Sequence, residues 1–167
     1  SLDEPERSAW PVLEGQRLSA RARARCHHKD EEQRKRCTHG PSLLAGSVKK
    51  YKPYAPKVKY TPKQMEYYDA LSFRYEKTVE VALYFFRSLE SYLYSAESDT
   101  LRNRLLTMEK LGIIDSAEKW LEVRLLRNRV AHAYLPAELK VIYAKIIKFS
   151  DLILKDFSRA DTYVSKL

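Results

Sequence analysis

Apolar residues return every three or four positions between residues 65 and 93, and this spacing predicts one long amphipathic helix. The apolar stripe consists of Met65, Tyr68, Leu71, Tyr75, Val79, Ala82, Phe86, Leu89 and Leu93. Thr61 is a favourable N-cap, and Pro62 suits the first helical position, where its missing N–H leaves no hydrogen bond unmade. We therefore expect a helix over residues 62–94, followed by a turn over residues 95–99.

Two further helical patterns follow this turn. Residues 100–111 form a shorter segment that ends at Gly112, a residue type common just beyond helix ends. Asp115 and Glu118 have the spacing of a capping box and predict the start of a third helix. The apolar residues of that helix are Trp120, Leu121, Leu125 and Ala131.

Pro136 limits the third helix and suits the first position of a fourth. The apolar residues of this last helix are Leu139, Ile142, Ile146, Phe149, Ile153 and Phe157. No segment shows the alternation of a half-buried strand. The pattern therefore predicts an all-α fold, an antiparallel bundle of about four helices over residues 61–167.

Residues 1–60 differ in composition from the rest of the chain. They contain five of the seven prolines, three of the four glycines, and 14 Lys and Arg against 7 Asp and Glu. Residues 61–167 contain 17 basic and 15 acidic residues, so most of the net charge of +9 lies in the first third. We expect an irregular, partly disordered basic arm, with at most a short helix around residues 16–36. Such an arm is attracted to nucleic acid or acidic surfaces, but it is also typical of a solvated tail.

Several classes of protein are disfavoured. The chain has no run of 18 apolar residues and no apolar stretch near its polar N-terminus, so we expect neither a membrane span nor a signal peptide. Two cysteines without an export signal favour a reducing cytoplasm. With only four glycines and no serine-centred nucleophile elbow, neither a phosphate-binding loop nor a serine hydrolase is indicated.

A zinc site in the arm is the weaker of two interpretations of its cysteines and histidines. Cys26, His28, Cys37 and His39 are suitable ligand types. Their C-x-H pairs are shorter than usual zinc spacings, and no hydrophobic anchor flanks them. Chance ligands in a basic tail explain them better, and we expect no metal and no cofactor.

The histidine of most interest is His132, five residues after Arg127. This R-x4-H spacing alone decides nothing, because two pairs in the arm share it (Arg23 with His28, and Arg34 with His39). The context differs: Arg127 and His132 lie near the end of a capped amphipathic helix, together with Asn128 and Tyr134.

On an ideal helix Asn128 and His132 share a face, whereas Arg127 and His132 lie roughly 140° apart. Arg127 and His132 can therefore act together only if the helix unwinds before Pro136 or if a second subunit completes the site. A simpler explanation also exists. A histidine at a helix end interacts favourably with the helix dipole, and nearby arginines pair with surface acids.

Residues 120–136 (WLEVRLLRNRVAHAYLP) resemble the signature helix of the HEPN superfamily. More narrowly, they resemble HepT-type toxins and the related substrate-binding subunits of nucleotidyltransferases, with the motif RN-x3-H-x-Y at Arg127 to Tyr134. Residues 69–77 (DALSFRYEK) are similar to the first helix of these proteins. The resemblance covers roughly residues 61–160 and not the arm. Ala133 departs from it, since many relatives have an acidic residue there.

The resemblance implies a metal-independent endoribonuclease toxin that acts as a homodimer on RNA. RNA carries its own nucleophile, the 2′-hydroxyl. His132 would act as general base or acid, because imidazole titrates near neutral pH. Arg127 would stabilise the charge on the phosphate, and Asn128 would orient the histidine or the phosphate. In these relatives the tyrosine that matches Tyr134 is the one to which a minimal nucleotidyltransferase antitoxin attaches AMP, which adds bulk and negative charge beside the site.

Two other functions remain open. In the first, the bundle is a non-catalytic nucleotide- or partner-binding subunit of a minimal nucleotidyltransferase. In the second, the basic arm binds nucleic acid and the bundle is only a scaffold for dimerisation. The sequence leaves the RNA target undetermined.

Overall fold

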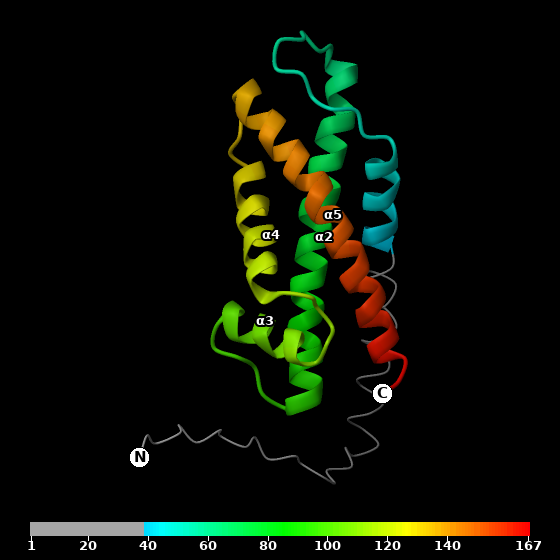
Figure 1. Ribbon diagram of the computed structural model, residues 1–167, viewed down its shortest axis with the longest axis vertical. Helices are drawn as coiled ribbons and strands as arrows, with labels where there is room; N and C mark the ends of the chain where they lie inside the picture. The colour runs from blue at the N-terminus through cyan, green and yellow to red at the C-terminus, as the bar shows by residue number, and fades with distance from the viewer. Residues whose placement is uncertain (1–38) are drawn as a thin grey trace, which may run out of the picture.

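The computed structural model describes residues 39–167, which are helical throughout apart from turns and loops (Figure 1). A helix over residues 39–49 is followed by α2 (Pro62–Tyr94), α3 (Leu101–Lys110), α4 (Ala117–Val130) and α5 (Pro136–Val164). This part of the chain contains no strand. The all-α prediction is therefore confirmed for the described residues.

The long helices lie side by side, and α3 closes one end of the molecule (Figure 1). Helix α2 contacts α3, α4 and α5, and α4 also contacts α3 and α5. In Figure 1, α2 and α5 run from the end that carries residues 50–61 to the opposite end, whereas α4 runs back. The connection between α4 and α5 thus lies at the same end as residues 50–61.

The start of α2 follows the predicted capping chemistry. The Thr61 hydroxyl accepts a hydrogen bond from the Gln64 N–H (3.3 Å), and the Gln64 side-chain oxygen accepts one from the Thr61 N–H (2.9 Å). This capping box satisfies two backbone donors, and Pro62 has none to satisfy. The helix ends where Ser95 adopts a left-handed conformation (φ 53°).

The predicted cap of α4 is wrong by one residue. Ser116 is the N-cap, and its hydroxyl accepts from the Lys119 N–H (3.3 Å). Asp115 instead pairs with Arg159 of α5 (3.1 Å). The Glu109 carboxylate of α3 also accepts a hydrogen bond from the Ala117 N–H (2.6 Å) at the start of α4. The spacing of residues around the start of α4 does not predict this contact with another helix.

Two buried hydrogen bonds connect α4 to its neighbours within the apolar core. The Tyr75 hydroxyl of α2 donates to the Val123 carbonyl (3.0 Å). The Trp120 indole N–H donates to the Asp156 carboxylate of α5 (2.7 Å). Both rings are fully buried, and each satisfies its polar atom inside the core. These contacts fix the position of α4 and of the residues at its C-terminal end.

The expected irregular arm over residues 1–60 requires a correction at its C-terminal part. Residues 39–49 form a helix, and Leu44 and Tyr54 are buried in the core. The contacts come from α2, because the hydroxyls of Tyr67 and Tyr68 donate to the carbonyls of Ser47 (2.8 Å) and Lys52 (2.9 Å). A boundary at residue 60 therefore separates residues that pack together. The short helix expected around residues 16–36, and the candidate ligands Cys26, His28 and Cys37, lie outside the described residues.

Candidate functional site at the end of α4

Helix α4 ends at Val130, before it reaches His132. Ala131 is the C-cap, and the His132 N–H donates to the Arg129 carbonyl (3.1 Å) in a final tight turn. Residues 133–135 have no regular structure, and Leu135 is extended (ψ 133°), as expected for the residue before Pro136. The helix thus stops ahead of the proline, which is one of the two conditions expected from the sequence.

His132 is exposed and lines a groove of about 550 Å³ between α4 and α5. The apolar side chains of this groove, called here the His132 groove, belong to Leu125, Leu126, Ala133, Ile142 and Phe149. Its polar side chains belong to Glu122, Asn128, Arg129, His132, Glu138 and Lys145. Two cations and two carboxylates therefore surround the imidazole, so the groove is mixed in charge and not strongly basic.

Asn128 and His132 share this groove, as their spacing of four residues predicts, but Arg127 does not line it. The Arg127 guanidinium forms an ion pair with Glu80 of α2 through Nη2, and its Nη1 donates to the Asn128 side-chain oxygen (3.2 Å). Its Nε is buried and has no hydrogen-bond partner among the described residues. Asn128 thus lies between the Arg127 guanidinium and the groove. Within one chain, Arg127 and His132 do not line the same hollow.

Glu80 completes the surroundings of Arg127. Burial raises the pKa of this carboxyl, but hydrogen bonds from Arg127 and Lys77 outweigh burial and hold its pKa below the usual range. Glu80 is therefore ionised at neutral pH and keeps the guanidinium against α2. Sequence analysis did not identify Glu80, and the available signal was slight: it is an acid on α2 outside the apolar stripe, with no indication of which helix faces it.

Among residues 39–167, Tyr134 is the most exposed of the large apolar and aromatic side chains, with 81% of its surface accessible. A second hollow, of about 210 Å³, lies on the α2 side of the α4–α5 connection and is lined by Asp69, Ser72, Phe73, Glu76, Val130, Ala133, Leu139, Ile142 and Tyr143. It shares Ala133 and Ile142 with the His132 groove. The connection that carries His132 and Tyr134 therefore lies between two hollows, and both of these side chains are exposed.

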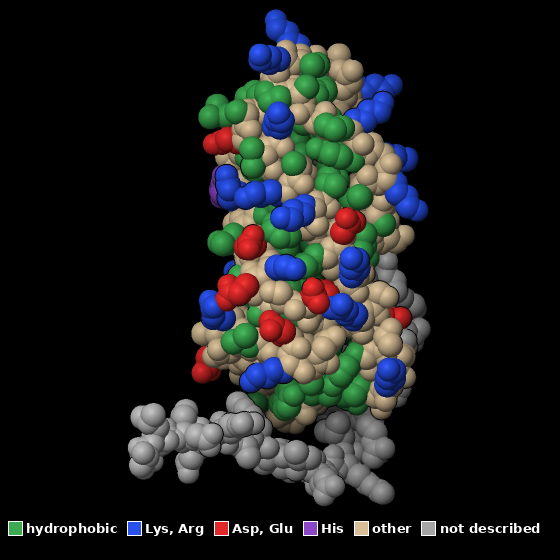
Figure 2. All heavy atoms as spheres, in the orientation of Figure 1, with side chains coloured by type: hydrophobic (Ala, Val, Ile, Leu, Met, Phe, Trp, Pro, Cys, Tyr) green, Lys and Arg blue, Asp and Glu red, His purple; other side chains and the backbone are tan. Residues whose placement is uncertain are grey.

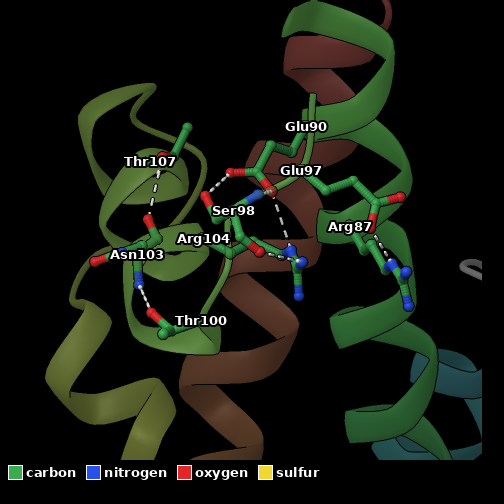
Figure 3. A network of polar contacts seen from close by, with 8 residues as sticks. All are labelled: Arg87, Glu90, Glu97, Ser98, Thr100, Asn103, Arg104 and Thr107. Atoms are coloured by element: carbon green, nitrogen blue, oxygen red, sulfur yellow. Dashed lines mark hydrogen bonds and ion pairs between the residues drawn. The ribbon is translucent and has the colours of Figure 1, made fainter. Parts of the chain in front are cut away.

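A polar network at the opposite end of α2 has a structural role (Figure 3). Glu90 is buried and accepts hydrogen bonds from the Ser98 N–H (3.0 Å), the Ser98 hydroxyl and the Arg104 Nε (3.1 Å). Arg104 also donates to the Ser98 carbonyl (3.3 Å). Burial raises the pKa of Glu90, but the bonds from Ser98 and Arg104 outweigh it, so the pKa lies below the usual range. The network fixes the turn between α2 and α3, and none of its buried side-chain polar atoms lacks a hydrogen-bond partner.

The described residues contain no cluster of three or more His, Cys, Asp or Glu side chains suited to a metal ion. Among those same residues, no helix is long and apolar enough to cross a membrane.

No protein-family model matches this chain, and no curated protein or solved structure shows a significant match to it.

Proposed function

We propose that this protein is a HEPN-type endoribonuclease toxin that cleaves RNA without a metal ion at a site formed by Arg127 and His132. The observation that carries the proposal is the end of α4: the helix stops at Val130 and leaves His132 exposed in a groove beside Asn128, Arg129 and Lys145. An exposed imidazole beside cations and an amide suits proton transfer at a phosphodiester whose nucleophile is the RNA 2′-hydroxyl.

The second part of the proposal is that the site is completed in a homodimer. Within one chain Arg127 faces Glu80 and His132 faces the groove. In a dimer the arginine of one subunit approaches the histidine of the other, so each of two equivalent sites takes one of these residues from each chain, and the histidine transfers the proton. Exposed apolar side chains beside the site, Leu125 and Leu135 (each 62% accessible), are available for such a contact.

The third part concerns the partner. We propose that a minimal nucleotidyltransferase antitoxin neutralises the toxin by attaching AMP to Tyr134. The exposure of this side chain, on the connection that carries His132, supports the proposal. An adenylate there adds bulk and negative charge that compete with RNA phosphates for the site.

The first experiment measures cleavage of total RNA by the full chain in EDTA. We expect the wild type to cleave, the His132→Ala variant to be inactive, and His39→Ala to retain activity. His39 is the matched control, because it is also exposed and also follows an arginine by five residues. Circular dichroism verifies that both variants are folded. Cleavage that survives in His132→Ala, or that requires added metal, contradicts the proposal.

A complementation experiment tests the dimer. Inactive Arg127→Ala and His132→Ala proteins are mixed and allowed to exchange subunits. If each site takes its arginine and histidine from different chains, mixed dimers contain one intact site, and roughly a quarter of the wild-type activity returns. A mixture that stays inactive despite subunit exchange contradicts a composite site.

One observation favours the alternative of a non-catalytic nucleotide- or partner-binding subunit of a nucleotidyltransferase: the ion pair between Arg127 and Glu80, which keeps the arginine out of the His132 groove. In that case ATP or another nucleotide raises the melting temperature of the protein, and no RNA is cleaved. Cleavage in EDTA that depends on His132 excludes this alternative.

A further inference from the structure

The loop that connects the helix of residues 39–49 to α2, together with the adjoining residues of both helices, carries an unusual concentration of positive charge. Residues 49–63 contain six lysines and no acidic residue, whereas the whole chain has a net charge of +9. These residues, called here the lysine loop, carry Lys49, Lys50, Lys52, Lys57, Lys59 and Lys63. All six side chains are exposed, and none forms an ion pair with another residue of the described range. Their charges are therefore available to a ligand.

Tyrosine side chains of the loop, α2 and α5 pack together and hold the lysine loop in place. Tyr54 stacks on Tyr60 (4.8 Å between ring centres) and packs edge-on against Tyr68 and Tyr143 (5.3 Å each). The Tyr60 hydroxyl accepts from the Ala55 N–H (2.9 Å), and the Tyr68 hydroxyl donates to the Lys52 carbonyl (2.9 Å). Burial raises the pKa of Tyr68, so its hydroxyl stays protonated and remains a donor.

This support has an energetic consequence. A loop that is already ordered loses little conformational entropy when a ligand binds, so its lysines contribute more to affinity than those of a free tail. Pro53 and Pro56 restrict the backbone of the same loop further. The lysine loop is thus a preorganised cationic surface.

The lysine loop lies at the end of the bundle that also carries the α4–α5 connection (Figure 1). Tyr143 links the two regions, because it packs against Tyr54 and also lines the smaller hollow beside Ala133. Figure 2 shows Lys and Arg side chains at this end and along the adjoining flank. A long polyanion seated on the loop is therefore directed toward the end of the molecule that carries His132.

We propose that the lysine loop is a second RNA-binding surface, separate from the His132 groove, that holds the phosphate backbone of structured RNA. The chemistry favours RNA over an anionic membrane. The tyrosine rings are packed inward (Tyr54 is 6% accessible), and Val58 is the one large apolar side chain that the loop exposes, so little is available to insert into lipid. Because the His132 groove has mixed charge, it provides little electrostatic affinity for RNA. The lysine loop provides that affinity instead. The choice of RNA as ligand rests on the proposed function.

The test compares two triple variants of the full chain in the non-cleaving His132→Ala background. Lys52, Lys57 and Lys59 are changed to Gln in the first. The control variant changes Lys110, Lys155 and Lys166, which are also exposed and lie outside the loop. Both lose three positive charges, so a difference between them reports position and not net charge. Binding of a fluorescent RNA stem–loop is measured by anisotropy at several salt concentrations.

We expect the loop variant to bind at least about tenfold more weakly at low salt, with a slope of log affinity against log salt that is smaller by about 2 to 3. The control variant keeps the slope of the His132→Ala parent to within about one. Equal losses in the two triple variants, or no loss in either, overturn the proposal. So does weaker binding by the loop variant to phosphatidylserine vesicles without weaker binding to RNA, since the loop then serves a membrane. Because binding is measured without cleavage, the result stands apart from the fate of the nuclease proposal.

Discussion

Replacement of Glu90 by alanine is the sharpest test of the structure, because Glu90 neutralises a nearly buried arginine. Glu90 is 3% accessible, and the Arg104 side chain is 14% accessible. The variant leaves Arg104 with only the Ser98 carbonyl as a partner in this network and removes the acceptor of the Ser98 N–H. Removal of one partner of a buried ion pair costs about 3 to 5 kcal/mol. For a protein of this size the melting temperature is then expected to fall by roughly 6 to 20 °C.

The matched control is Glu97→Ala, which removes the Glu97 ion pair with Arg87 (2.6 Å) on the same turn. Both of those side chains are more than a third exposed, so the loss is expected to be below about 1 kcal/mol. Free energies of unfolding come from urea titrations of the full chain monitored by circular dichroism.

The role of charge is tested by pH and by a double variant. The pKa of Glu90 is lowered in the folded protein, so its contribution is fully present above the pKa of the unfolded chain and is lost as pH falls through the folded pKa. The difference between wild type and Glu90→Ala is therefore expected to shrink in acid. Glu90→Leu combined with Arg104→Met removes both charges and should recover much of the loss. If Glu90→Ala costs no more than Glu97→Ala, or the double variant is no more stable than Glu90→Ala, the reasoning is refuted.

Three other predictions test local features in the same unfolding assay. Ser116→Ala should lower the free energy of unfolding by about 1 kcal/mol, because the hydrogen bond that caps α4 disappears. Asp115→Ala should lower it by less. Equal losses would indicate that Asp115 also caps the helix. Asp156→Ala should lower the free energy of unfolding by about 1 to 3 kcal/mol, because the Trp120 indole N–H loses its acceptor. Asp156→Asn should lower it less, since the amide keeps an oxygen that can accept this hydrogen bond. Equal effects of Ala and Asn contradict that interpretation. Glu80→Gln should lower the free energy of unfolding by at most about 1 kcal/mol, since both side chains of its ion pair with Arg127 of α4 are more than a third exposed. A larger loss would mean that this ion pair supports the fold.

The extent of the fold after residue 60 was predictable because its signals are local. Thr61 and Pro62 placed the start of α2, and the three-to-four spacing of apolar residues carried it to Tyr94. Pro136 likewise placed the start of α5. The predicted N-cap of α4 was wrong by one residue, because Asp115 forms an ion pair with Arg159, far along the chain, and Ser116 caps the helix. Capping by sequence pattern is reliable only when no distant charge competes for the side chain.

The packing of residues 39–60 was not predictable from their own sequence. This segment has prolines, lysines and no apolar period, so it looked like part of a solvated arm. Its order comes from tyrosines of α2 that donate hydrogen bonds to its carbonyls, and from tyrosines of α2 and α5 that pack edge-on against Tyr54. These contacts join residues far apart in the chain, and helical periodicity carries no information about them.

The sequence by itself determined that this chain is helical after residue 60 and that Asn128 and His132 lie close together near a helix end. Both follow from periodicities of a few residues. Only the tertiary structure decided that Arg127 faces Glu80 and not the groove, and that the lysines of residues 49–63 stand on a fixed loop. The physical reason is the same in each case. Charge pairing and aromatic packing depend on which helices meet, and that is settled by the core as a whole.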